Sequence, residues 1–178
     1  DVSAYIPTNV ISITDGQIFL ESDLFNAGMR PAVNVGLSVS RVGGAAQTKA
    51  MKKAAGSIRI DLAQYREMEV FTQFSSDLDA ITKEQLEYGK RLMELLKQPL
   101  SEPLSLHAQV ITLCAATHKL FLDVPVKELK KFQKDMLAYL DQKHPQIGEE
   151  IEELHSLSDT LINKIIDAVK EYKSQVVK

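Results

Sequence analysis

The sequence is poor in cysteine and in long apolar runs. Its single cysteine, Cys114, lies in the apolar run "VITLCAA", so no disulfide can form within these 178 residues. We expect Cys114 to be a small buried side chain, and a reducing compartment fits this usage. No apolar stretch approaches the roughly 20 residues that a helix needs to span a bilayer.

An excess of basic charge is also missing. The chain has 21 Lys and Arg residues against 24 Asp and Glu residues, which gives a net charge of −3. Proteins that bind nucleic acid by neutralising phosphates carry a basic surface, so this composition argues against a nucleic-acid partner. The hydrophobic share of 44% and the charged share of 25% are typical of a globular protein.

The common catalytic and phosphate-binding motifs are absent from the sequence. It contains neither G-x-S-x-G nor the phosphate-binding loop G-x-x-x-x-G-K-[ST]. Its four histidines are scattered without the spacing of a zinc site, so no metal site is expected. The histidines are His107, His118, His144 and His155. A helical enzyme acting on its own is therefore disfavoured.

The first 47 residues have the pattern of a short α/β piece. "NVISIT" (9–14) is rich in β-branched residues at alternating positions, which predicts a strand, and "QIFLE" (17–21) predicts a second one after the Asp15-Gly16 turn. "ESDLFNAG" predicts one helical turn closed by Gly28, and the segment 30–40 is expected to be extended. Two strands are not stable alone, and the chain starts at Asp1 without Met, so we expect it to be part of a longer polypeptide.

From Ala45 onward the apolar spacing becomes helical. Residues at intervals of three and four predict about five helices. "TKEQ" suggests a capping box in which Thr82 begins a helix that runs to about Lys97. The last predicted helix carries apolar residues from Leu154 to Val176. The expected fold is mainly α, with the end of a nucleotide-binding α/β domain at 1–47 and a helical domain at 48–178.

Arg41 stands in a loop of small residues, "SRVGGAAQ". Such an arginine is most often a surface group. A guanidinium is also a planar, permanently charged donor that can stabilise charge on phosphoryl oxygens, and an arginine finger does so from a neighbouring subunit. The residues alone leave both interpretations open. The acidic stretch "SSDLD" (75–79) is likewise either a plain interhelical loop with a helix cap or a loop that faces a partner.

A resemblance to a known family narrows these alternatives. "PAVNVGLSVS" (31–40) resembles the signature of the nucleotide-binding subunits of rotary ATP synthases: a proline, a small residue, an aliphatic residue, Asn or Asp, and a final Ser-x-Ser. The longer segments 8–53 and 62–79 are similar to the alpha subunit of the F-type, proton-translocating ATP synthase. The resemblance covers the whole chain. It implies about the last third of such a subunit, namely the end of its nucleotide-binding domain and its C-terminal helical domain.

For the catalytic site, this resemblance implies roles for three residues. Arg41 matches the arginine finger that an alpha subunit extends into the catalytic site of a neighbouring beta subunit. Ser12 and Val39 match alpha residues that line the same interface. The implied reaction is the synthesis of ATP from ADP and phosphate, driven by a proton gradient, and the chain alone should be inactive.

For the non-catalytic nucleotide site of the alpha subunit, the resemblance implies four further residues. These are Phe25, Arg30, Pro31 and Gln98, the last of which matches a glutamine that contacts adenine. The family often has a second glutamine where this chain has Leu100, so this sequence departs from the family at the base-binding position.

The resemblance also implies cofactors, partners and location. ATP or ADP with Mg²⁺ is expected in the full complex and none for this chain alone. The expected partners are beta subunits in an alternating hexamer and the central rotor shaft, toward which 75–79 would point. The complex lies peripherally on an energy-transducing membrane, on the cytoplasmic face in bacteria. The alternative is a stand-alone helical interaction module without catalysis.

Overall fold

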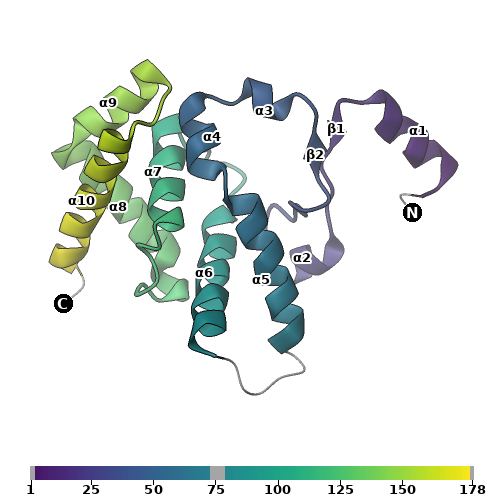
Figure 1. Ribbon diagram of the computed structural model, residues 1–178, viewed down its shortest axis with the longest axis horizontal. Coiled ribbons are helices and arrows are strands. Elements are labelled where there is room, and N and C mark those ends of the chain that lie inside the picture. The colour runs from purple at the N-terminus through teal and green to yellow at the C-terminus, as the bar shows by residue number, and fades with distance from the viewer. Residues whose placement is uncertain (1–2, 73–78, 177–178) are drawn as a thin grey trace. The chain divides into compact units, whose positions relative to one another are not determined.

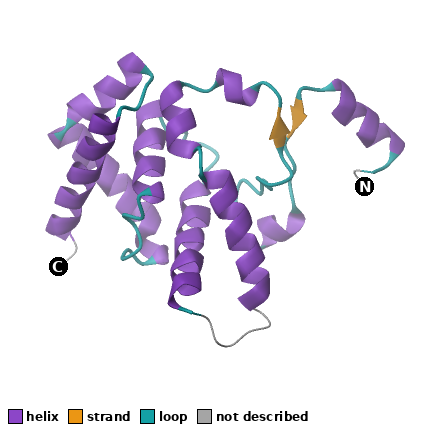
Figure 2. Cartoon of the chain, in the orientation of Figure 1, coloured by secondary structure: helices purple, strands orange, loops and turns teal. Residues whose placement is uncertain are grey.

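The computed structural model describes residues 3–72 and 79–176. It divides into two compact units, Asp1–Gln47 and Thr48–Lys178, which are described separately below. Figure 2 shows that helices dominate the described residues and that strands occur only as one short pair. The expectation of a mainly α chain with a C-terminal helical bundle is therefore confirmed.

The described residues of the first unit form three short helices and one pair of strands. The elements are α1 (Tyr5–Ile13), β1 (Gly16–Gln17), α2 (Ser22–Asn26), β2 (Val39–Ser40) and α3 (Gly43–Ala46). The strands are antiparallel, with Gly16 opposite Ser40 and Gln17 opposite Val39. The helical turn α2 is followed by Gly28 at φ +83°, a left-handed conformation that suits glycine, so the predicted turn is confirmed.

The strand predicted at 9–14 is wrong, because residues 9–13 lie in α1 and Thr14 is its C-cap. None of the residues of α1 is buried, so the apolar alternation has no sheet to face within the described residues. A helix satisfies its backbone groups internally, whereas a strand needs a neighbour. Hydroxyl groups add local bonds: those of Thr8 and Thr14 donate to the backbone oxygens of Ala4 and Val10. The second predicted strand, 17–21, is reduced to β1 and an isolated bridge between Leu20 and Val33.

The second unit is a helical bundle. Its elements are α4 (Lys49–Ala55), α5 (Ile58–Thr72), α6 (Ala80–Leu96), α7 (Leu106–Thr117), the 3₁₀ turn η1 (Val126–Glu128), α8 (Leu129–Lys143), α9 (Pro145–Leu154) and α10 (Asp159–Val176). Figure 1 shows α5 and α6 side by side as an antiparallel hairpin. The helix α7 packs against α4, α8, α9 and α10 and forms the centre of the bundle.

Two helix boundaries differ from the sequence predictions. The capping box at Thr82 is wrong: Asp79 is the N-cap of α6, and its carboxylate accepts a hydrogen bond from the Thr82 N–H at 2.6 Å. The predicted helix beginning at Leu154 is also wrong, because Leu154 ends α9. His155 follows it in a left-handed conformation at φ +50°, which stops the helix before α10 begins at Asp159.

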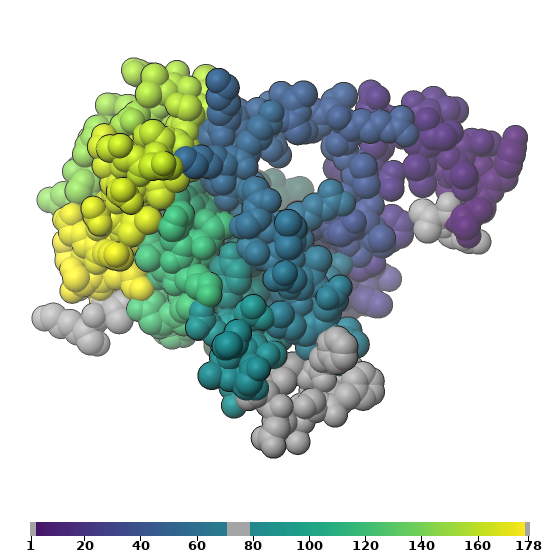
Figure 3. Space-filling model, viewed as in Figure 1, coloured from purple at the N-terminus to yellow at the C-terminus, as the bar shows by residue number. Residues whose placement is uncertain are grey.

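The core of the second unit is mainly apolar. Large, fully buried side chains come from α6 to α10, namely Leu92 of α6, Ile111 of α7, Met136 of α8, Ile151 of α9 and Ile165 of α10, among others. In the space-filling view of Figure 3 the yellow atoms of α10 lie against the green atoms of α7. Burial of this kind contributes about 25 cal/mol per Å² of apolar surface, so this unit carries a substantial stabilising core of its own.

Candidate functional site around Arg41

The loop before Arg41 is organised by the side chain of Asn34, which is only 5% exposed. Its amide oxygen accepts hydrogen bonds from the N–H groups of Gly36 at 3.0 Å and Leu37 at 3.1 Å. Its amide nitrogen donates to Glu21 Oε1 at 2.7 Å. One buried side chain therefore closes the turn at 34–37 and attaches it to the residue that precedes α2.

Two serine hydroxyls continue this network toward Arg41. Ser38 Oγ donates to the backbone oxygen of Asn34 at 2.6 Å and accepts from the Phe19 N–H at 2.9 Å. Ser40 Oγ accepts from the Gly43 N–H at 2.8 Å, across the turn that contains Arg41. The Ser-x-Ser spacing of the signature thus places one hydroxyl before the strand β2 and one at its end.

The backbone of Arg41 itself is fixed by the strand pair. Its N–H donates to the carbonyl oxygen of Asp15 at 2.8 Å, next to the paired residues Gly16 and Ser40. A Cβ atom at Gly16, whose φ is +154°, would lie 2.2 Å from the Val39 carbonyl oxygen. Only glycine permits this close approach, so Gly16 is needed for β1 to hold β2 at this distance.

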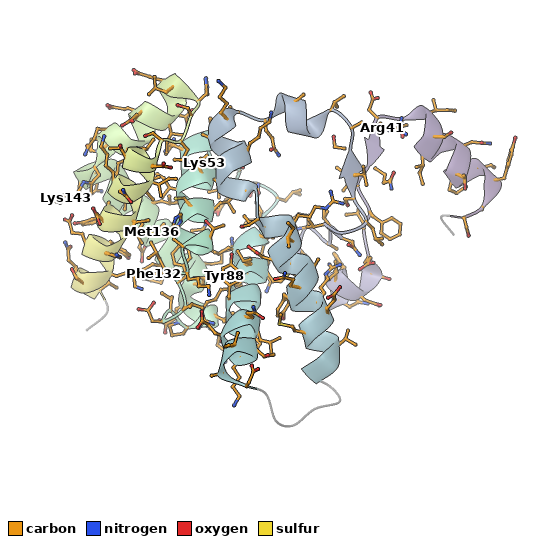
Figure 4. The ribbon with its side chains drawn as sticks, in the orientation of Figure 1. Arg41, Lys53, Tyr88, Phe132, Met136 and Lys143 are labelled. Carbon is orange, nitrogen blue, oxygen red and sulfur yellow. The ribbon has the colours of Figure 1, made fainter. Side chains whose placement is uncertain are left out.

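The Arg41 side chain is exposed (Figure 4). Its guanidinium forms no hydrogen bond or ion pair within residues 3–72 and 79–176, while its backbone is held on both sides. An arginine with a fixed backbone and an unpaired guanidinium is suited to donate to an anionic group outside this chain.

The other residues that the resemblance connects with catalysis are both exposed. Val39 lies in β2, two residues before Arg41. Ser12 lies in α1, and its hydroxyl donates to the Asn9 carbonyl oxygen at 2.7 Å within the same helix.

Three of the four residues connected with the non-catalytic site lie together in the first unit. The Arg30 guanidinium carbon is 4.3 Å from the centre of the Phe25 ring, a cation–π contact, and Pro31 follows Arg30 through a cis peptide bond. Phe25 and Pro31 are also exposed. Gln98 lies in the second unit, in the segment between α6 and α7, and is exposed like the neighbouring Leu100.

Sequence reasoning missed the residues that hold the loop, above all Glu21 and Asn34. An asparagine two residues before a glycine is a known turn signal, because its amide bonds the backbone two residues on. That signal was present in "NVG". Nothing in the spacing could reveal that the partner of the amide nitrogen is Glu21, thirteen residues earlier in the chain.

Other chemistry is scarce in the part of the chain that the structure describes. No group of three or more His, Cys, Asp or Glu side chains there could hold a metal ion. Cys114 is 1% exposed, as predicted, and burial raises the pKa of its thiol to about 11, so it is not an activated nucleophile. Among the described helices, none is both long and apolar enough to cross a membrane.

Comparison with known proteins finds the same family that the signature at 31–40 indicated. Residues 47–172 match the family model described as ATP synthase alpha/beta chain, C terminal domain, and residues 1–40 match the ATP synthase alpha/beta family, nucleotide-binding domain. The chain belongs to the ATP synthase alpha/beta family. The two matches of this family meet near the division between the two compact units.

Within the ATP synthase alpha/beta family, the chain is similar to alpha subunits. It is 58% identical over 173 residues to the ATP synthase subunit alpha of Thermobifida fusca, covering 97% of this chain and 32% of that protein. The corresponding proteins of Clostridium kluyveri and Aquifex aeolicus are 56% and 55% identical, over 97% and 99% of this chain and 34% and 35% of their own lengths. The chain thus spans about a third of the length of these curated relatives.

Proposed function

We propose that this chain acts as part of the alpha subunit in the catalytic head of an F-type ATP synthase, which makes ATP with a proton gradient, and that Arg41 is its arginine finger. The observation that carries the proposal is the difference between the backbone and the side chain of Arg41. Its backbone is fixed by Asp15 and by the Ser40 turn, whereas its guanidinium has no partner in the described residues. Similarity to ATP synthase alpha subunits supports the choice of complex.

The proposed role of Arg41 is electrostatic. During phosphoryl transfer, charge is spread over the oxygens of the transferred group, and a guanidinium that donates two hydrogen bonds to them lowers the barrier. The finger is more effective when the backbone that carries it is fixed before the reaction, because a mobile loop would lose conformational freedom at the transition state. The hydrogen-bonded loop at 34–43 supplies this positioning.

We propose that the substrate and its Mg²⁺ bind at a site on another chain. The described residues contain no cluster of three or more His, Cys, Asp or Glu side chains that could hold a metal ion, and the sequence has no phosphate-binding loop. We therefore place the catalytic nucleotide on a neighbouring beta subunit, with Arg41, Ser12 and Val39 at the interface. The exposure of all three side chains supports this placement.

A second nucleotide site is proposed for the alpha subunit itself. The exposed pair of Arg30 and Phe25, with Pro31 beside it, offers a cation and an aromatic face, which are groups that bind phosphate and an adenine ring. Gln98 is the proposed contact to the base. The side chain of Leu100 can neither donate nor accept a hydrogen bond, so base recognition here would depend on fewer polar contacts than with two glutamines.

The remaining parts of the proposal concern the rotor and the membrane. The loop 75–79 is proposed to face the central shaft; its residues 75–78 lie outside the described residues, and Asp79 caps α6. The complex would lie on the membrane surface, on the cytoplasmic face in a bacterium, with no nucleic-acid partner.

The test is Arg41→Lys in the assembled complex that contains this chain. Lysine keeps the charge but not the planar two-donor geometry, and a lost finger lowers turnover by about a thousandfold or more. The measurement is kcat for ATP hydrolysis together with the nucleotide Kd at the catalytic site, which should change little. Arg59→Lys, in α5, is the matched control and should retain turnover. Near-normal turnover of Arg41→Lys would remove Arg41 from this role.

A different class of function, a stand-alone helical interaction module, has one observation in its favour. The second unit has its own apolar core and needs no other chain to bury it. This alternative predicts that the first unit is equally stable in the isolated chain, which is the measurement described at the end of the Discussion.

A further inference from the structure

The Arg41 loop depends on a side chain that must donate and accept hydrogen bonds at once. Asn34 is the residue at which three segments meet: the turn at 36–37, the residue Glu21 before α2, and the backbone of Phe19, whose carbonyl oxygen accepts from the Asn34 N–H at 2.8 Å. Buried polar atoms need partners, and each of these groups has one.

The orientation of the Asn34 amide is determined by its neighbours. The N–H groups of Gly36 and Leu37 both point at one end of the amide, which must therefore be the oxygen. The carboxylate of Glu21 faces the other end and can only accept, so that end must be the NH₂ group. Glu21 thereby selects an asparagine at position 34 over an isosteric aspartate, whose second oxygen would face a carboxylate.

The path from this pair to Arg41 is short and made of hydrogen bonds. The backbone oxygen of Asn34 accepts from both the N–H and the hydroxyl of Ser38, and this hydroxyl also holds the Phe19 N–H. The two residues that follow Ser38 form β2, and Arg41 comes next. A displacement of Asn34 would therefore move the start of β2, to which the finger is attached.

We propose that Asn34, oriented by the Glu21 carboxylate, is a positioning residue that sets the approach of Arg41 to the catalytic site of the neighbouring subunit. The inference rests on the proposed function of Arg41 and adds to it the residue pair that gives this loop its rigidity. It also states a specificity rule: the signature accepts Asn or Asp at this position, and a carboxylate at position 21 favours Asn, because Asn donates to it without being protonated.

The experiment uses the assembled complex and moves the amide group from position 34 to position 21. Asn34→Asp places two carboxylates against each other, and kcat should fall on the order of tenfold, the usual effect of losing one hydrogen bond to a charged group. The double variant Asn34→Asp with Glu21→Gln restores a donor opposite an acceptor, so kcat should return to within about twofold of the original. The nucleotide Kd at the catalytic site should stay constant throughout.

The controls separate positioning from a general loss of structure. Asp23→Asn removes one negative charge from the same region without touching Asn34 and should leave kcat unchanged. If Asn34→Asp does not assemble, Glu21→Ala replaces it, with an expected severalfold fall in kcat in an assembled complex. A double variant as slow as Asn34→Asp, or a Glu21→Ala complex with the original kcat, would overturn the inference.

The same series distinguishes this inference from the proposed function. If the Arg41→Lys complex is slow but the Asn34→Asp complex has the original kcat, Arg41 remains the proposed finger and Asn34 is not a positioning residue. If the Arg41→Lys complex has nearly normal turnover, both the finger role of Arg41 and the positioning role of Asn34 are excluded.

Discussion

The two units of this chain are stabilised in different ways. In the second unit, apolar side chains from α4 to α10 form a core in which many are fully buried. In the described part of the first unit, Met29 and Ala32 are the buried apolar residues, and the loop there is held by hydrogen bonds of Asn34, Ser38 and Ser40. Hydrogen bonds contribute little net stability but fix geometry. The loop of the first unit therefore has a defined backbone with little apolar burial, whereas the second unit is stabilised mainly by its core.

The largest effect that would sharpen this comparison comes from the same substitution in each unit. Ile165→Ala removes a 0% exposed side chain from α10 and should lower the free energy of unfolding by about 2–5 kcal/mol. Ile13→Ala, at an 83% exposed position in α1, should change it by less than about 0.5 kcal/mol. Denaturant unfolding of the isolated chain measures both. Equal losses in the free energy of unfolding would show that Ile13 is buried in a core, contrary to the difference drawn between the two units.

A smaller effect tests how closely the hairpin of the second unit is packed. A Cβ atom at Gly89 of α6 would lie 2.2 Å from Cδ2 of Tyr65 in α5, so Gly89→Ala should destabilise the chain by about 1–3 kcal/mol. Gly148→Ala in α9 is the matched control, because its nearest neighbour, the His107 ring, is 3.3 Å away. Alanine there gains about 1 kcal/mol of helix propensity, which offsets the contact. The comparison fails if Gly89→Ala unfolds at the denaturant concentration of the original chain.

The smallest effect concerns pH and the start of α6. The hydrogen bond from the Thr82 N–H lowers the pKa of Asp79, so this carboxylate stabilises the folded state above its unfolded pKa of about 4 and loses that contribution as the pH falls through the folded pKa. Asparagine is also a good N-cap but does not titrate. Asp79→Asn should therefore have a similar Tm at pH 7 and a smaller fall in Tm on acidification. Parallel Tm curves for the two chains would exclude this role for the carboxylate.

The helical bundle was predictable from the sequence because its signal is local. Leu129, Phe132, Met136 and Leu140 recur at intervals of three and four residues, and all four lie in one helix, α8, which ends at Lys143. The errors arose where one side chain outweighs periodicity. Asp79 rather than Thr82 caps α6, and a left-handed His155 divides the last predicted helix.

The first unit was less predictable because its stability is not local. The segment 9–14 has strand composition, yet its residues 9–13 form the second half of α1, whose side chains are not buried against a sheet among the described residues. Arg41 could be selected as a candidate because it lies among the small residues of "SRVGG", and its proposed role came from the resemblance at 31–40. The pair of Glu21 and Asn34 could not be found from the sequence, because a hydrogen bond across thirteen residues leaves no periodic pattern.

Hydrogen exchange of the isolated 178-residue chain tests the central contrast most directly. Amides that open only with global unfolding are protected, while those in weakly stabilised segments exchange quickly. The account predicts strong protection in α7 and α10 and little protection in 3–47. Equal protection of both units, lost together in denaturant, would contradict it. That result would favour a self-sufficient interaction module over a chain whose first unit is completed by other parts of an ATP synthase.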